Sequence, residues 1–307
     1  MQSSLSKTLI VVVGPTAIGK TSLGIQLAKY FKTEIISGDS RQFFKEMNIG
    51  TAVPNSEELV AVPHHFIQHI SIEQKYSVGD FEKDALLKIN KLFKTNEYVL
   101  MVGGSGLYVD AVCNGLDNFP PINPNIKVEV EKIYNEKGLE ALTEILQEKD
   151  PVHYATIELQ NPHRVIRAVE VCLSSGKPYS SFLRKEKIRR SFNVIKIGLE
   201  ADRQIIYDRI NHRVDIMFEN GLLEEARKVY PKRQLNALNT VGYKELFHYF
   251  DGKWNLDFAI SEIKKNTRRF AKRQLTWYRK DESIQWFNYT EDPSKIIEFI
   301  EAQKGEN

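Results

Sequence analysis

One stretch of this sequence decides the fold: Thr8-Leu9-Ile10-Val11-Val12-Val13-Gly14-Pro15-Thr16-Ala17-Ile18-Gly19-Lys20-Thr21. Its first part is an unbroken aliphatic and β-branched run, the pattern of a strand that is buried on both faces of a parallel sheet. Its second part matches G-x-x-x-x-G-K-[ST], the pattern of a phosphate-binding P-loop, in full. Apolar residues then recur at helical spacing over residues 20–31, which predicts a helix directly after the loop.

Each part of the loop has a physical role in binding phosphate. The two glycines let the backbone curl until its N–H groups face phosphate oxygens, and the following helix adds its positive end. The lysine supplies a cation, and the Thr21 hydroxyl can ligate Mg²⁺. A chance glycine turn is the alternative. We predict that a diphosphate or triphosphate binds Gly14, Pro15, Thr16, Ala17, Ile18, Gly19, Lys20 and Thr21, with the metal on Thr21.

The rest of the chain continues an α/β pattern. Apolar runs predict strands at 34–37, 98–102, 193–199 and 284–288, and helical spacing predicts helices at 81–93, 202–219, 222–229, 242–250 and 258–279. This order is typical of a parallel sheet flanked by helices, as in P-loop NTPases, with the loops that follow the strands along one edge.

A helical insertion interrupts this core. Prolines at 120, 121 and 124 mark its start, a basic run at 184–190 marks its end, and helices are expected at 129–137, 139–149 and 162–173. We predict a first core segment at 1–119, the insertion at 120–190 and a second core segment at 191–307.

Composition excludes several classes of protein. The chain has 307 residues, 42% of them hydrophobic, and a net charge of +3, which suits a globular protein. Its two cysteines, Cys113 and Cys172, form no CxxC pair, which argues against a disulfide framework or a zinc site and favours the cytoplasm. No apolar run reaches the about 20 residues that span a bilayer, so we expect no membrane partner.

Two further loops are expected at the P-loop edge of the sheet. Asp39 follows the second strand, and its carboxylate could bind a metal, act as a general base or cap a helix. The strand at 98–102 ends in Gly103-Gly104, without the acid that holds Mg²⁺ in P-loop NTPases, which weakens a hydrolytic role. Ser105 follows these glycines and could donate a hydrogen bond.

A basic helix near the C-terminus points to a polyanion. Cations at helical spacing without acids suit a phosphate backbone. The alternative is a solvated amphipathic helix with its aromatic residues in the core, which is the stronger interpretation for Trp277. His64 and His65 are neighbours on an extended chain and point in opposite directions, so a structural role is favoured over a shared metal. The cations are Lys264, Lys265, Arg268, Arg269, Lys272, Arg273, Arg279 and Lys280.

In order along the chain, these motifs resemble one family, the tRNA dimethylallyltransferases, also called tRNA isopentenyltransferases. The matching segments are residues 14–21, 36–40, 47–52, 102–108, 161–170, 241–245 and 267–277. The resemblance implies transfer of a dimethylallyl group from dimethylallyl diphosphate to N6 of the adenosine 3′-adjacent to the anticodon (position 37) in tRNAs reading UNN codons. Diphosphate is released, and the P-loop holds the prenyl diphosphate.

The resemblance also implies roles for individual residues. Asp39 would be the general base, with Lys20 and Ser105 also catalytic, in a monomeric cytoplasmic enzyme that uses Mg²⁺. The family often has threonine where this chain has Ser105, and aspartate where it has Gln68. The anticodon stem-loop of tRNA would contact Asp39, Ser40, Arg41, Gln42, Ser105, Lys127, His163, Arg164, Val165, Ile166, Arg167, Arg269 and Arg273.

Three other functions fit parts of the sequence. A P-loop small-molecule kinase would consume ATP without RNA. A non-catalytic RNA-binding protein would bind tRNA equally well after Lys20→Ala. Prenylation of free adenine nucleotides is a third. The basic helix and the insertion favour a macromolecular acceptor over this last alternative.

Overall fold

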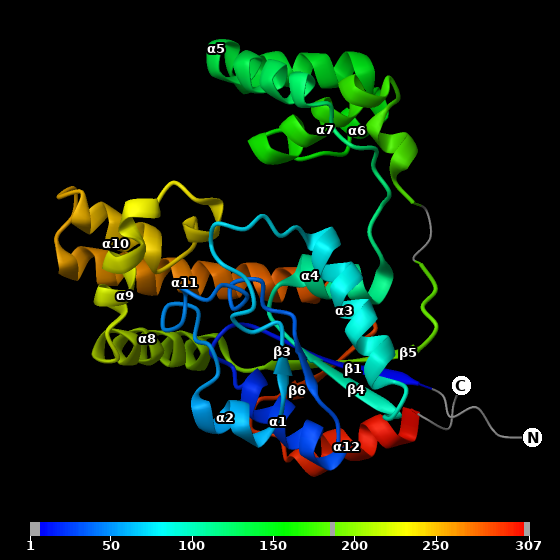
Figure 1. The fold of residues 1–307 in the computed structure, drawn as a ribbon, viewed down its shortest axis with the longest axis vertical. Coiled ribbons are helices and arrows are strands. Elements are labelled where there is room, and N and C mark those ends of the chain that lie inside the picture. Colours follow the sequence, from blue (N-terminus) through cyan, green and yellow to red (C-terminus); the bar gives the residue numbers. More distant parts are fainter. Residues whose placement is uncertain (1–6, 185–187, 304–307) are drawn as a thin grey trace, which may run out of the picture. The chain divides into compact units, whose positions relative to one another are not determined.

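Figure 1 shows the computed structural model, which describes residues 7–184 and 188–303. The chain divides into two compact units. One combines Met1–Asn114 with Arg189–Asn307, and the other is Gly115–Ile188. Residues 185–187, part of the basic run that we expected to close the insertion, lie outside the described residues.

A six-stranded parallel sheet forms the centre of the first unit, with the strand order β3-β2-β4-β1-β5-β6. The strand that precedes the P-loop is central, because Thr8 lies opposite Tyr98 on one side and opposite Asn193 on the other. The α/β fold predicted from the P-loop stretch is therefore confirmed. The strands are β1 (Thr8–Val13), β2 (Ile35–Ser37), β3 (His64–His65), β4 (Tyr98–Val102), β5 (Asn193–Glu200) and β6 (Ile284–Asn288).

The aliphatic run of β1 is explained by its two buried faces. Leu9 and Val11 belong to one hydrophobic cluster, Ile10 and Val12 belong to a second, and all four are fully buried. Helices cover both faces of the sheet (Figure 1). The first cluster includes residues of α3 (Val78–Leu92), α4 (Gly106–Asn114), α9 (Leu222–Val229) and α10 (Tyr243–Phe250), and the second includes residues of α1 (Lys20–Tyr30) and α12 (Pro293–Ala302).

Two longer helices contribute to both clusters. They are α8 (Arg203–Glu219) and α11 (Leu256–Tyr278), and both were predicted within about two residues of their ends. The short helix α2 (Ser56–Ala61), strand β3 and helices α4 and α12 were not predicted. None of the helices of the described chain is long and apolar enough to cross a membrane.

The second unit is helical. It contains α5 (Pro124–Lys149), α6 (Pro151–Tyr154) and α7 (Pro162–Ser175), which share a core that includes Val130, Leu142 and Val165. Gly138 interrupts α5 with a φ of 80°, a left-handed conformation that glycine adopts without strain. The break divides α5 close to where the sequence predicts two separate helices.

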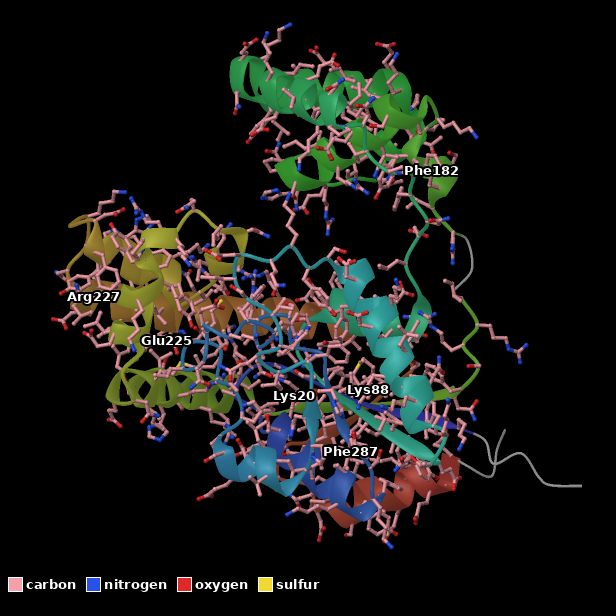
Figure 2. The ribbon with its side chains drawn as sticks, in the orientation of Figure 1. Lys20, Lys88, Phe182, Glu225, Arg227 and Phe287 are labelled. Atoms are coloured by element: carbon pink, nitrogen blue, oxygen red, sulfur yellow. The ribbon has the colours of Figure 1, made fainter. Side chains whose placement is uncertain are left out.

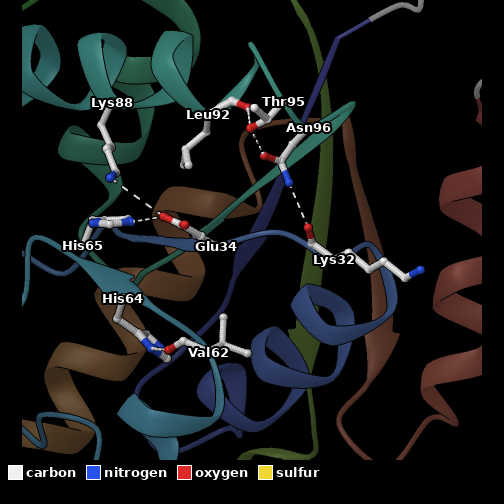
Figure 3. Close-up of polar contacts among 9 residues, drawn as sticks. All are labelled: Lys32, Glu34, Val62, His64, His65, Lys88, Leu92, Thr95 and Asn96. Carbon is white, nitrogen blue, oxygen red and sulfur yellow. Dashed lines mark hydrogen bonds and ion pairs between the residues drawn. The ribbon is translucent and has the colours of Figure 1, made fainter.

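The adjacent histidines have separate structural partners at the edge of the sheet (Figure 3). His64 Nδ1 lies 2.8 Å from the carbonyl oxygen of Val62, whereas His65 Nε2 lies 2.5 Å from the carboxylate of Glu34. Burial is the largest effect on both rings and lowers the pKa of each. The two rings therefore brace strand β3, as the structural interpretation of this pair expects.

Candidate active site

The P-loop joins β1 to α1 with a backbone that only glycine allows at its ends. Gly14 has a φ of 144° and Gly19 a φ of 112°. A Cβ atom on Gly14 would lie 2.7 Å from the carbonyl oxygen of Leu199 in β5. The loop is therefore held against the neighbouring strand, with its N–H groups and the start of α1 at the carboxyl edge of the sheet.

Lys20 reaches back into this loop. Its Nζ donates to the carbonyl oxygens of Gly14, at 3.0 Å, and Pro15, at 2.8 Å. Burial lowers the pKa of Lys20 to about 8, which the negative charge of Asp39 opposes and the positive charge of Arg213 reinforces. A partly buried cation within a P-loop favours the arrival of a phosphate, because the anion restores interactions that water supplies only in part.

Two arginines of α8 also contact the P-loop, and sequence reasoning missed both. Arg213 Nη1 donates to Thr16 Oγ1 at 3.2 Å, and Arg209 Nε donates to the carbonyl oxygen of Ala17 at 2.7 Å. They lie four residues apart and therefore share one face of the helix. Burial lowers the pKa of Arg213, and the charge of Asp39 opposes this shift. The four-residue spacing of Arg209 and Arg213 is visible in the sequence, but the sequence does not show that this face of α8 contacts the P-loop.

The loop after β2 carries the predicted base. Asp39 Oδ1 accepts a hydrogen bond from the N–H of Arg41 at 3.1 Å, so the carboxylate also orders its own turn. Beside it, Ser105 Oγ accepts from the N–H of Ser40 at 3.0 Å and lies 3.1 Å from Ser40 Oγ. The loop at residues 103–106, called the glycine loop below, thus holds the Asp39 loop in place.

Helix α11 closes the site with two side chains. Gln274 Oε1 accepts from the N–H of Thr16 at 2.8 Å, while its Nε2 donates to the carbonyl oxygen of Gly104 at 2.9 Å. Trp277 Nε1 donates to Asp110 at 2.8 Å, and the indole is 40% exposed. The core interpretation of Trp277 is therefore wrong. Its ring lies over Gly106, where the absence of a side chain leaves room for it.

These elements surround a cavity of about 450 Å³, within the range of small-molecule sites. The P-loop, the Asp39 loop and the glycine loop supply its polar side. Its apolar side comes from Ile210, Val214, Met217, Leu222, Ile263 and Phe270. The edge-of-sheet prediction for Asp39 and Ser105 is confirmed, because both line this cavity together with Thr16, Ala17, Ser40, Arg41, Arg213, Arg273 and Gln274.

Other predicted site residues stand apart from this cavity. Gln42 braces the chain internally, since its Nε2 donates to the carbonyl oxygens of Thr51, at 3.3 Å, and Ala52, at 2.8 Å. Arg269 is exposed on α11. In the second unit Val165 is fully buried, so its side chain is not available to a ligand in this conformation. The remaining predicted contacts of that unit are the exposed Lys127, His163, Arg164 and Arg167, and the half-buried Ile166.

The donor set suits Mg²⁺ bound together with phosphate. Mg²⁺ takes oxygen ligands and is usually held by one or two protein groups plus substrate phosphates. Thr21, the second residue of α1, supplies such an oxygen within the P-loop. Within the described ranges, no group of three or more His, Cys, Asp or Glu side chains gathers to form an all-protein metal site.

Fold and site together define a class: an α/β protein with a P-loop and a cavity at the carboxyl edge of a parallel sheet. The comparisons narrow this class. The family model of the IPP transferases matches residues 42–281. A tRNA dimethylallyltransferase from Christiangramia forsetii is 60% identical over 299 residues, covering 97% of this chain and 99% of that protein. Another, from Flavobacterium johnsoniae, is 59% identical over 300 residues, covering 96% and 97%.

Solved structures that resemble this chain are named as enzymes of the same family as its sequence relatives. The tRNA isopentenylpyrophosphate transferase from Bacillus halodurans has a TM-score of 0.72 at 38% identity, covering 98% of this chain and 97% of that one. A eukaryotic dimethylallyltransferase captured acting on tRNA has a TM-score of 0.79 at 26% identity, covering 93% and 75%. The chain belongs to the IPP transferase family, whose members include the tRNA dimethylallyltransferases.

Proposed function

We propose that this protein transfers a dimethylallyl group from dimethylallyl diphosphate to N6 of adenosine 37, the nucleotide 3′-adjacent to the anticodon, in tRNAs reading UNN codons. The observation that carries the proposal is the meeting of Thr16 and Ala17 of the P-loop with Asp39 and Ser105 at one cavity. Family membership at 60% identity to a tRNA dimethylallyltransferase supports the same reaction.

The P-loop is the proposed donor site. Its amides, Lys20 and Arg213 present positive charge where the diphosphate oxygens would lie. As the bond between the allylic carbon and the diphosphate oxygen breaks, its electron pair leaves with the diphosphate. These groups stabilise that growing negative charge, and because they are already in place, no reorganisation is needed during the reaction. The apolar side of the cavity suits the five-carbon group.

Asp39 is the proposed base on the acceptor side. The lone pair of adenine N6 is delocalised into the ring, so the nitrogen attacks well only if its proton is removed as the N–C bond forms. The Asp39 carboxylate accepts that proton. Ser105, held against Ser40, donates or accepts a hydrogen bond at the incoming nucleotide. The adenosine leaves the anticodon-loop stack to reach the cavity, as other base-modifying enzymes require.

Mg²⁺ is the proposed cofactor. When bound, it would supply further positive charge to the diphosphate. Thr21, with its hydroxyl at the start of α1, is the residue that would hold it. Because one chain contributes every group of the cavity, we propose a monomer, and the tRNA substrate supports a cytoplasmic location.

The test combines the purified protein with radiolabelled dimethylallyl diphosphate, Mg²⁺ and unmodified tRNA. We expect label in tRNAs that read UNN codons, and mass analysis of their nucleosides should identify N6-dimethylallyladenosine. Parallel reactions with free AMP and with a tRNA lacking adenosine at position 37 should stay unlabelled. Absence of label from every tRNA would refute the proposal. Label in AMP alone would show that the acceptor is the free nucleotide and not tRNA.

A further inference from the structure

Gln274 connects the P-loop to the glycine loop, and the proposed reaction gives this residue no role. Its amide lies between two loops that come from different strands: the P-loop after β1 and the glycine loop after β4. The side chain is only 6% exposed although it lines the cavity. Only one orientation of the amide satisfies both partners, because the P-loop offers an N–H and the glycine loop offers a carbonyl oxygen.

The connection continues to the proposed base. Ser105 stands next to Gly104 in the glycine loop and accepts a hydrogen bond from the N–H of Ser40 at 3.0 Å. Ser40 follows Asp39 directly. A continuous path of hydrogen bonds and adjacent residues therefore runs from Thr16, on the donor side of the cavity, to Asp39, on the acceptor side. Within this path, the Gln274 amide links the loop after β1 to the loop after β4.

The fit around Gln274 leaves little freedom. A Cβ atom on Gly104 would collide with its Nε2, so the glycine loop approaches the amide as closely as a backbone can. One helical turn later, Trp277 packs on Gly106 and bonds Asp110. Helix α11 is thus fixed to the glycine loop at two successive turns, and Gln274 is the side chain through which it also holds the P-loop.

We infer that Gln274 is a positioning residue for the proposed transfer: its amide fixes the diphosphate-binding loop and the loop beside Asp39 at the separation that the reaction needs. The inference rests on the proposed function. It assigns Gln274 no contact with reacting atoms. Its effect comes through geometry, because attack on the allylic carbon requires the acceptor nitrogen to be aligned with the leaving diphosphate, and small displacements there are costly.

The first experiment replaces Gln274 with leucine, which has similar volume but cannot form hydrogen bonds. We expect kcat for dimethylallyl transfer to fall by about 10- to 100-fold. The KM for tRNA should stay within about threefold, because the exposed cations of α11 remain. Thr276→Ala is the matched control, since Thr276 is exposed on the same helix and bonds only the carbonyl oxygen of Lys272, at 3.0 Å. This control should keep the wild-type kcat.

The second experiment uses Gln274→Glu. A protonated carboxyl has one donor and one acceptor, as the amide does, whereas the ionised form has only acceptors and faces the Gly104 carbonyl. We expect the ratio of variant to wild-type kcat to rise as the pH falls from 8.5 to 5.5. The charged groups that line the same cavity or stand close to Gly104 are Lys20, Asp39, Arg41, Arg213, Lys244 and Arg273. All six are present in both proteins, so their own titration largely cancels in the ratio.

Two results would overturn the inference: a wild-type kcat in Gln274→Leu, or a kcat ratio for Gln274→Glu that does not change with pH. The second stands even if the leucine variant fails to fold. A wild-type protein that leaves tRNA unlabelled is a different outcome, because it contradicts the proposed function and not the role of Gln274.

Discussion

The Tyr243 hydroxyl donates a hydrogen bond to Glu225 Oε1 at 2.6 Å, and the same carboxylate accepts three backbone N–H groups of residues 48–50 at 2.8 to 3.0 Å. Glu225, labelled in Figure 2, thereby joins α9 and α10 to a loop whose Gly50 and Thr51 line the cavity. A Cβ atom on Gly50 would lie 2.7 Å from the Tyr243 hydroxyl oxygen. The carboxylate therefore fixes one wall of the site.

Replacement of Glu225 by glutamine should destabilise the protein. The amide nitrogen cannot accept a hydrogen bond, so it would face donors that have lost their partner. We expect a loss of about 1–3 kcal/mol in the free energy of unfolding, measured by chemical denaturation. Glu224→Gln is the control, because Glu224 is exposed and its ion pair with Arg227 is long, at 3.9 Å. Equal stability of the two variants would contradict this role.

Lys20 should make stability depend on pH. In the fold its pKa is about 8, against 10.5 for the unfolded chain. The unfolded state therefore binds the proton more tightly, and the cost of the buried charge is fully present below pH 8 and disappears as the pH rises towards 10.5. Lys20→Met should be more stable than wild type at pH 7 by up to about 3 kcal/mol, and the difference should shrink above pH 8.

The measurement is chemical denaturation of both proteins at pH 7, 8.5 and 10, with inorganic diphosphate binding measured by calorimetry at pH 7. The methionine variant should lose diphosphate binding while gaining stability. Lys29→Ala, an exposed lysine at the other end of α1, serves as the control and should change neither property. A stability difference that is the same at every pH would show that the buried charge is not its cause.

The parts of the fold that follow from local pattern were predictable. Strand β1, the P-loop and α1 are adjacent in sequence, and apolar runs indicated β4, β5 and β6. Helix α2 buries none of its residues and depends on a capping box between Asn55 and Glu58. Strand β3 has two residues and is defined by pairing with β2. Neither has enough hydrophobic pattern to be recognised without the sheet.

The residues of the candidate site also fall into a predictable group and an unpredictable group. Asp39 and Ser105 were predictable because the loops after parallel strands meet at one edge. Gln274 and Arg213 were not, because they lie 258 and 197 residues from the Thr16 that they contact. The sequence predicts the helices that carry them, but which face of each helix meets the P-loop depends on how α8 and α11 pack across the sheet.

Asp39→Asn should separate loop structure from chemistry. The asparagine oxygen can still accept the hydrogen bond from the N–H of Arg41, so the turn should persist. The amide cannot take the N6 proton, and we expect kcat to fall by about 10²- to 10⁴-fold. Affinity for tRNA, measured by filter binding, should stay within about twofold of wild type. Asp208→Asn, at an exposed position on α8, is the control. An Asp39→Asn variant with wild-type kcat would remove the base role.

The exposed cations of α11 should govern tRNA affinity. Acids already neutralise Lys264, paired with Asp215 at 2.5 Å, and Lys265, paired with Glu262. Arg269 and Lys272 are exposed, and residues 264–280 contain no acid. If these side chains contact phosphates, each replacement by alanine should weaken binding of all tRNAs alike and lower the slope of log affinity against log salt by about 1.

The salt titration distinguishes this contact from a general charge effect. Binding of tRNA is measured by fluorescence anisotropy between 50 and 200 mM salt, roughly the range over which such contacts change affinity strongly. Lys29→Ala lowers the net charge equally but lies on α1, so its slope should match wild type. The KM for dimethylallyl diphosphate should be unchanged in every variant, because the P-loop is intact. Equal slopes for Lys272→Ala and Lys29→Ala would mean that α11 attracts tRNA only through net charge and does not touch its backbone.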